Sequence, residues 1–322
     1  MRAISILLLV VACSSKGGTE LPPPPPGGGG GQGGRTTLAD GAAGQTPGDD
    51  GAAGAAGTDA SGAIEDGGAD AGVSAADAVG IDGGTGPGGA SLCPGSNFAI
   101  CENFENTAVG AIPINWTRRQ NNYGGRLMGL GVVADEAMRG QRSLRIQGGV
   151  NGSQFIEYTR NLGGLAMSHY GRIFFRVEVP APWPTSGVLH GDIVQHVGPR
   201  TGGGNNYVRW GIVENTVMKF QWIYNVQPDN AAEFGDGTAY NYTWPGTWQC
   251  LEWRFDQPTQ QGTLWIDGGQ IPVPVGKSHP PEIPVFNSLG VGWSNYQNAP
   301  GDGFMVWIDE VAIDAKRIGC DR

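Results

Sequence analysis

No phenylalanine, tryptophan or tyrosine occurs before Phe98, so all 28 aromatic residues fall in the later part of the chain. Residues 14–92 consist almost entirely of Gly, Ala, Asp, Pro, Ser and Thr. A segment without large apolar side chains cannot bury enough surface to offset the entropy lost on ordering. We therefore expect residues 13–92 to form a disordered low-complexity tether and residues 93–322 to fold around one sizeable core.

The acidity of the chain follows the same division. Most of the formal net charge of −10 belongs to residues 14–92, where ten acidic residues face only Lys16 and Arg35. Like charges keep such a segment solvated and extended. The expected folded part is nearly neutral and has no basic patch above background, so nucleic acid is not an expected partner.

The first residues have the layout of an export signal. Arg2 supplies a positive charge, and residues 4–12 form an apolar run too short to span a bilayer. The motif VVAC, ending at Cys13, resembles the lipobox of bacterial lipoproteins. The resemblance implies a signal peptide over 1–12, a membrane anchor through lipid on Cys13 and, with Ser14 following, a place in the outer membrane or at the cell surface. An ordinary signal peptide with an incidental cysteine is the alternative.

Four further cysteines, Cys93, Cys101, Cys250 and Cys320, would then face an oxidising compartment. Three pairings are open to them. We favour Cys93–Cys101, around a Pro-Gly-Ser turn, together with Cys250–Cys320, which would tie the chain end to a central strand. No Cys-x-x-Cys pair or nearby histidine supports a zinc site.

From Phe98 onward the chain carries short runs rich in aromatic and β-branched residues, many of which alternate with period two. Turn-forming residues separate the runs, and no stretch beyond a turn or two has helical periodicity. This pattern predicts an all-β sandwich or barrel. The expected strands are 143–149, 155–160, 172–179, 207–213, 217–225, 248–256, 262–267, 289–296 and 304–313.

Three stretches resemble the concanavalin A-like superfamily. CENFENTAVGAIPINW (101–116) resembles its opening strand and loop, and WQCLEWRFD with QQGTLWIDGG (248–269) resembles a hairpin of laminin-G-like and glucanase-like jelly rolls. GDGFMVWIDEVAIDAKRIGC (301–320) resembles the closing strand of the fungal cellulose-induced-protein core, which is akin to polysaccharide lyases. The resemblance implies a two-sheet antiparallel jelly-roll sandwich with a groove for sugar chains on the outer face of its more curved sheet.

Lectins, hydrolases, lyases and non-catalytic modules all use this fold, so it does not decide the activity. Our first expectation is binding of a polysaccharide or other glycan by a monomer without an organic cofactor. One alternative is a polysaccharide lyase that cleaves a uronate-containing polymer by β-elimination, and another is a structural or adhesion module. A retaining glucanase is disfavoured, because Glu252 has no acidic partner two residues away.

The stretch GVLHGDIVQHVGPR (187–200) is the most suggestive of chemistry. On an ideal strand His190, Asp192 and His196 share one face and Gln195 lies on the other, although a β-bulge near Gly191 would change this.

A lyase needs a group that neutralises the uronate carboxylate, a base for the C5 proton and an acid for the leaving oxygen. Gln195 or Arg209 would neutralise, His190 or His196 would be the base, and Tyr296 would be the acid. Polar residues on a solvated sheet face are the alternative interpretation.

Other side chains are candidates for contact with sugar. Arg209 shares a face with Tyr207 if Val208, Trp210 and Ile212 point to the core. Aromatic rings can stack on pyranose rings, which also makes Trp244 a candidate. The residues expected to bind substrate are His196, Tyr207, Gln221, Trp222 and Tyr224.

The resemblance further implies one structural Ca²⁺, held by Glu105, the Gly140 region and Asp309. Oxygen ligands from distant segments suit such a hard cation. A cap or a salt bridge is the alternative role for these carboxylates. We expect the acidic stretch EFGDGT (233–238) to be a plain loop, and His169 and His279 to lie at the surface.

Overall fold

The structure is a computed structural model that describes residues 91–93, 95–121, 129–149, 151–229, 231–274, 282–297 and 303–320. The expected signal peptide, the lipidation site Cys13 and the tether up to residue 90 lie outside the described residues, as does His279. Among the residues described, no helix is long and apolar enough to cross a membrane.

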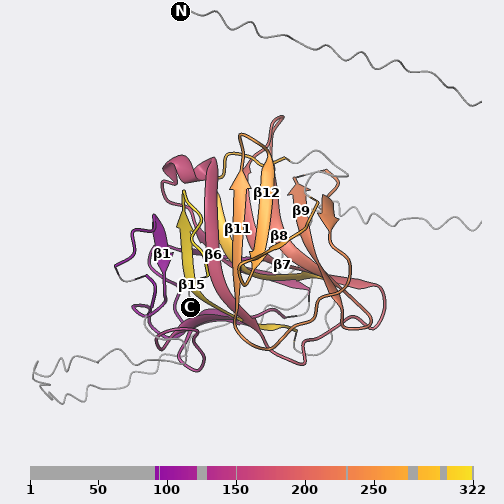
Figure 1. Ribbon diagram of the computed structural model, residues 1–322, viewed down its shortest axis with the longest axis horizontal. Coiled ribbons are helices and arrows are strands. Elements are labelled where there is room, and N and C mark those ends of the chain that lie inside the picture. The colour runs from indigo at the N-terminus through magenta and orange to yellow at the C-terminus, as the bar shows by residue number, and fades with distance from the viewer. Residues whose placement is uncertain are drawn as a thin grey trace, which may run out of the picture. The chain divides into compact units, whose positions relative to one another are not determined.

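The described chain folds into two antiparallel sheets that pack face to face as a sandwich, which confirms the predicted fold class (Figure 1). The single helical element in these ranges is a 3₁₀ turn, η1 (Gly163–Ala166). The eight-stranded sheet has the order β13 (Gly269–Ile271), β12 (Gln261–Ile266), β11 (Gln249–Asp256), β6 (Ser168–Val177), β15 (Met305–Asp314), β4 (Ser143–Gln147) and β3 (Gly129–Val133), and β1 (Ile100–Glu102) also pairs with β15.

The seven-stranded sheet carries the candidate site. Its order is β10 (Phe234–Gly237), β9 (Phe220–Pro228), β8 (Asn205–Asn215), β7 (Val188–Pro199), β14 (Ser288–Tyr296), β5 (Gly152–Tyr158) and β2 (Thr117–Asn121). Residues 234–237 were expected to be a loop, but they form β10 because their backbone pairs with Ile223–Val226 of β9. The nine expected strands are all present, with ends that differ by a few residues.

The core is an aromatic layer between the two sheets. Trp210 of β8 stacks on Phe255 of β11, with ring centroids 5.8 Å apart. His169 of β6 also lies in this layer, fully buried, so its predicted surface position is wrong. The reason is the register of β6, which turns alternate side chains toward the other sheet; the Nδ1 of His169 lies 2.8 Å from the Leu165 carbonyl oxygen.

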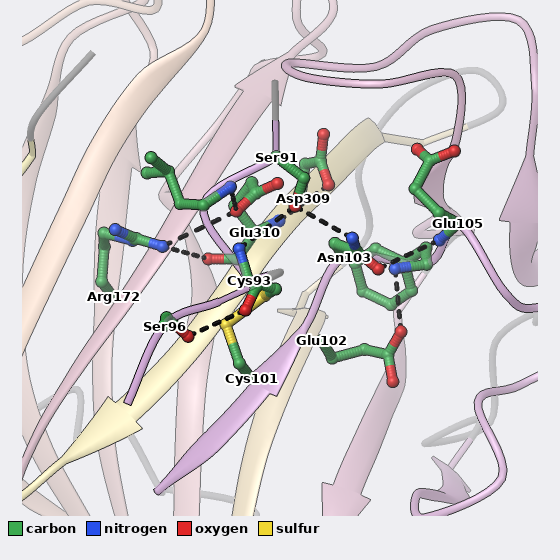
Figure 2. Close-up of a disulfide and its surroundings, with 12 residues drawn as sticks. Ser91, Cys93, Ser96, Cys101, Glu102, Asn103, Glu105, Arg172, Asp309 and Glu310 are labelled. Carbon is green, nitrogen blue, oxygen red and sulfur yellow. Dashed lines mark hydrogen bonds and ion pairs between the residues drawn. A yellow bond between two sulfur atoms is a disulfide. The ribbon is translucent and has the colours of Figure 1, made fainter. Parts of the chain in front are cut away.

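Two disulfides tie the ends of the described chain to the eight-stranded sheet, and both have the predicted pairing, Cys93–Cys101 and Cys250–Cys320. Figure 2 shows the first disulfide beside β15, where the buried carboxylate of Glu310 faces Arg172 across 3.8 Å. Glu310 also accepts the backbone N–H of Leu92, at 2.9 Å. The start of the described chain is therefore fixed to β1 by the disulfide and to β15 by the hydrogen bond from Leu92.

Candidate functional site

The face of each residue on β8 follows the predicted alternation. Val208, Trp210 and Ile212 are fully buried between the sheets, so Tyr207 and Arg209 point to the outer face of the seven-stranded sheet. This confirms the expected face of Arg209. The inner residues anchor the strand in the core, which leaves the outer residues available for contacts beyond the fold.

Strand β7 changes its alternation partway. Its register with β8 shifts between Asp192 and Val194, which marks a β-bulge. Before the bulge His190 and Asp192 pair with outward positions of β8, and after it Gln195 pairs with Arg209. The bulge thus places His190, Asp192 and Gln195 on one face and turns His196 inward.

A cavity of about 230 Å³ lies on this outer face. It brings together His190, Arg209 and Tyr296, three of the four predicted catalytic residues, and Tyr296 is the cross-strand partner of His190. A second cavity of about 340 Å³ also contains His190 and Tyr296 and extends over β9 and β10. The described side chains that line the first cavity are those of His190, Asp192, Arg209, Ile223, Gln227, Glu233, Ser294 and Tyr296.

Asp192 is the central acceptor of the first cavity. Its Oδ2 accepts a hydrogen bond from the Ser294 hydroxyl at 2.7 Å and lies 3.6 Å from Nε of Arg209. The Asp192 and Arg209 side chains are both mostly buried, so water screens this ion pair less than a surface pair. The positive charge of Arg209 is therefore already balanced by the Asp192 carboxylate.

The orientation of His190 is fixed by the residue after Tyr296. The Oε1 of Gln297 lies 3.0 Å from the backbone N of His190 and 3.0 Å from its Nδ1. A backbone N–H can only donate, so it identifies the contacting Gln297 atom as the oxygen. Nδ1 must then carry the ring proton, and Nε2 of the neutral ring is left as an acceptor.

Two amide side chains flank Arg209 in the same row across the sheet. Gln195 pairs with Arg209 on one side and Asn225 pairs with it on the other. Gln195 is 1% exposed and Asn225 is 5% exposed. Within the described residues the Oε1 of Gln195 and the Oδ1 of Asn225 have no hydrogen-bond partner, and the amide nitrogen of Asn225 contacts Glu233.

A glycine beside Asp192 lets the strands approach closely at the bulge. A Cβ added to Gly211, the cross-strand partner of Asp192, would lie 2.2 Å from the carbonyl oxygen of Gly191. No side chain fits there without moving the backbone. Gly211 therefore keeps the Asp192 side of the cavity clear and the bulge closely paired.

Three of the predicted substrate-binding residues lie elsewhere. The side chains of His196, Trp222 and Tyr224 are buried between the sheets, so the structure corrects their expected position on the groove, although Tyr224 also borders the second cavity. The bulge turns His196 inward, and the alternation of β9 turns the two aromatic rings inward. Trp244 also packs in this layer, with its ring 4.2 Å from that of Phe220.

The other two predicted substrate-binding residues do reach the outer face. Gln221 lines the second cavity, and its amide donates to the Tyr240 hydroxyl at 3.3 Å. Tyr207 lies under Arg119, whose guanidinium is 5.9 Å from the centre of the ring. Burial raises the pKa of Tyr207, so its hydroxyl keeps its proton and can donate a hydrogen bond.

The expected calcium ligands bind a backbone turn. The Oδ2 of Asp309 accepts the N–H groups of Met138 and Arg139, and the Oε1 of Glu105 accepts those of Gln141 and Arg142. Gly140, between these two pairs, has a φ of 66°. One oxygen of each carboxylate therefore caps this turn, which is the alternative role considered for Glu105 and Asp309 in the sequence.

Burial raises the pKa of Asp309 well above its usual range. In the part of the chain that the structure describes, no group of three or more His, Cys, Asp or Glu side chains is arranged to hold a metal ion. The described contacts of Glu105 and Asp309 are those of the capping role, and calcium binding stays a prediction.

Several cavity residues were not found from the sequence. Asn225 lies on the outward side of β9 in step with Gln221, so period-two alternation would have found it. Ser294 and Gln297 flank the predicted Tyr296, but nothing in their residue types separates them from ordinary strand-end polar residues. Glu233 was assigned to a loop because of its glycine-rich surroundings.

No protein-family model matches the chain, and no curated protein matches it. Among solved structures, the receptor binding domain of botulinum neurotoxin mosaic serotype C/D matches with a TM-score of 0.42 and 14% identity, over 69% of this chain and 48% of that one. The binding domain of botulinum neurotoxin serotype D gives 0.41 and 13%, over 69% and 48%. A Trypanosoma rangeli sialidase gives 0.36 and 14%, over 59% and 27%. The chain thus spans about half the length of the first of these structures.

Proposed function

We propose that this sandwich is a concanavalin A-like module that binds a glycan on the outer face of its seven-stranded sheet. The observation that carries the proposal is the cavity lined by His190, Asp192, Arg209, Glu233 and Tyr296. Its neighbour over β9 and β10 extends the same face, so a chain of sugar units has room to lie across several strands.

The chemistry of the lining suits sugar hydroxyls. Each hydroxyl both donates and accepts a hydrogen bond, and the cavity offers carboxylate acceptors, a guanidinium donor and amide groups at close spacing. Tyr296 is 58% exposed at the rim, where its ring can cover the apolar face of a pyranose. In a small-ligand site, fixed polar groups orient the ligand and an aromatic ring adds contact area, and this cavity has both.

Binding of soluble oligosaccharides to the full chain, followed by isothermal titration calorimetry, tests this proposal. Arg209→Ala should weaken binding at least tenfold, because it removes a donor and leaves Asp192 buried without its counter-charge. Arg254→Ala is the matched control, since Arg254 lies on the eight-stranded sheet against Tyr170. Equal losses in the two variants, or no glycan bound by the native chain, would contradict the proposal.

A polysaccharide lyase is the second candidate, favoured by the convergence of His190, Arg209 and Tyr296 on one cavity. In that reaction Nε2 of His190 would take the C5 proton of a uronate, and the Tyr296 hydroxyl would protonate the leaving oxygen as the C4–O bond breaks. It ranks second because Arg209, the group that would neutralise the uronate carboxylate, is already paired with Asp192.

Absorbance near 235 nm separates the two candidates, because β-elimination creates an unsaturated uronate. A rise on alginate, glucuronan or pectate that disappears in His190→Ala and in Tyr296→Phe would establish the lyase. A flat trace on every polymer, together with glycan binding by calorimetry, would leave binding as the function.

We also propose that Cys13 is lipidated and that the protein is a monomeric outer-membrane lipoprotein at the cell surface. The support is the lipobox resemblance, since Cys13 lies outside the described residues. Incorporation of a labelled fatty acid into the native chain, and its loss in Cys13→Ser, would support the anchor. Native protein without the label would contradict the lipid anchor. A dimeric mass after detergent extraction would contradict the monomer.

A further inference from the structure

We propose that the ligand of the outer-face cavity is an amino sugar with a free ammonium group, presented as a polymer or an oligomer. The inference rests on the proposed glycan binding and names the class of sugar. The observations that carry it are the charge balance of the first cavity, the buried amide of Asn225 at the wall of the adjoining second cavity and the fixed acceptor on His190.

The charge balance of the cavity is negative. Among the described residues that line it, Asp192 and Glu233 are carboxylates and Arg209 is the cation. Arg209 and Asp192 are within 3.6 Å of one another, so their charges offset each other inside the site. Glu233 contacts the neutral amide of Asn225, and its charge therefore remains to act on a ligand.

The wall of the site also has a buried acceptor that the protein does not use. Asn225 lines the second cavity, is 5% exposed, and has an Oδ1 without a hydrogen-bond partner among the described residues. A buried amide oxygen without a donor costs free energy. A ligand N–H group that reaches this oxygen after a small movement of the Asn225 side chain removes that cost, whereas a carboxylate brings only further acceptors.

His190 adds another acceptor on the same face. The hydrogen bonds to Gln297 place the ring proton on Nδ1, so Nε2 offers a lone pair. A sugar ammonium has three N–H donors and a positive charge, and hydrogen bonds between charged partners are about twice as strong as neutral ones. Glu233, the Asn225 oxygen and His190 therefore form an acceptor set that suits an ammonium.

A uronate fits the same cavity poorly. Its carboxylate would enter a site where Glu233 is uncompensated and Arg209 is already paired with Asp192. Glu233 is exposed, so water screens its charge in part, but it still repels a carboxylate, which selects against this class of ligand. A neutral N-acetylated sugar avoids the repulsion but gives up the charge-assisted bonds.

Calorimetric titration of the full chain at pH 7 and low salt tests the inference with three tetrasaccharides of equal length. These are a glucosamine oligomer with free amines, its N-acetylated counterpart and a galacturonate oligomer. We expect the free-amine oligomer to bind at least tenfold more tightly than the N-acetylated one. The preference should shrink at 0.5 M NaCl, because salt screens the charge.

Glu233→Gln is the decisive variant, since it keeps the shape and removes the charge. It should reduce the preference for free amines to less than threefold while binding of the N-acetylated oligomer changes little. Glu178→Gln is the control, an exposed carboxylate just after β6 and away from the cavity. A preference that survives Glu233→Gln would overturn the role given to Glu233.

The remaining outcomes separate this inference from the proposed function. Equal binding of the first two oligomers would overturn the amino-sugar inference and leave glycan binding in place. Tightest binding of the galacturonate oligomer would overturn it in favour of the lyase class of substrate. No binding of any of the three, or of the wider oligosaccharide set, would overturn both.

Discussion

The rings of His169 and His196 lie 5.1 Å apart, centroid to centroid, in the fully buried layer between the two sheets. The indole N–H of Trp253 points at Nε2 of both, 3.4 Å from His169 and 3.1 Å from His196. Burial lowers the pKa of His169 to about 4, although its hydrogen bond to Leu165 opposes the effect. Burial, and then the proximity of His169, lowers the pKa of His196 well below its usual range.

This pair predicts sensitivity to acid. Between pH 6.5 and about 4 the unfolded chain binds protons at these histidines and the folded chain does not, so the free energy of unfolding falls as the pH falls. Each histidine contributes a slope of up to about 1.4 kcal/mol per pH unit. His169→Leu should reduce the slope, as measured by denaturant unfolding from pH 7 to pH 4.5.

Phe286→Leu is the matched control, because the ring of Phe286 also packs on His169 but carries no titratable group. It should lower the free energy of unfolding by a similar amount at every pH. If His169→Leu has the native slope, protonation of the buried pair does not cause the acid sensitivity.

Gln297 is expected to act as a positioning residue for His190. Gln297→Ala removes the acceptor of two hydrogen bonds, so the ring should populate both neutral tautomers. Glycan should then bind about threefold to tenfold more weakly, the effect of losing one ligand hydrogen bond of ~0.5–1.5 kcal/mol. The ¹⁵N chemical shifts of the His190 ring measure the tautomer directly. Gln297→Glu keeps an acceptor in place and should retain the Nδ1–H form; a single tautomer in Gln297→Ala would contradict this role.

Glu214 is a buried carboxyl at the core end of β8, and burial raises its pKa to about 7. Between pH 4.5 and 7 the folded chain holds a proton that the unfolded chain releases, so this group lowers stability as the pH rises. Glu214→Gln should remove that decline and be more stable than the native chain at pH 8, by up to ~3 kcal/mol. If the free energies of unfolding of the native chain and of Glu214→Gln change in parallel from pH 5 to pH 8, Glu214 does not titrate in this range.

The two disulfides should differ in their effect on stability. Cys250–Cys320 closes a separation of 70 residues and Cys93–Cys101 one of 8. Chain-entropy estimates give about 4.4 kcal/mol for the longer loop and about 2.5 kcal/mol for the shorter. Replacing each pair by alanines and measuring thermal unfolding should reproduce this order, and a larger loss from the Cys93–Cys101 pair would contradict the entropic account.

The strands were predictable because each is a run of aromatic and β-branched residues between turn residues. The face of Arg209 was predictable for the same reason, since β8 keeps its alternation from Tyr207 to Ile212. Applying that rule strictly to β9 would have kept Gln221 on the groove and sent Trp222 and Tyr224 to the core. Their aromatic rings suggested sugar contacts, but the alternation excluded them.

Other features depend on contacts between distant segments. The β7 bulge lies between Asp192 and Val194, just after the Gly191 at which the sequence allowed one, but only the pairing with β8 shows that it forms. Glu233 reaches the cavity because β10 pairs with β9, a pairing that its glycine-rich sequence does not predict. His169 contacts Leu165 nearby in the sequence, but the rings that bury it come from the distant strands β7 and β11, which the sequence alone does not bring together.

The bulge in β7 also restricts how this strand can change length. Each half of β7 is fixed in phase by its own neighbours: His190 by the cavity and His196 by the aromatic core. Deleting one residue between them would leave the two histidines five positions apart, so a regular strand without the bulge would keep His190 on the outer face and His196 in the core. A one-residue deletion between His190 and His196 should therefore give a folded protein with a regular β7, whereas a one-residue insertion there requires a second irregularity and should lower the stability more.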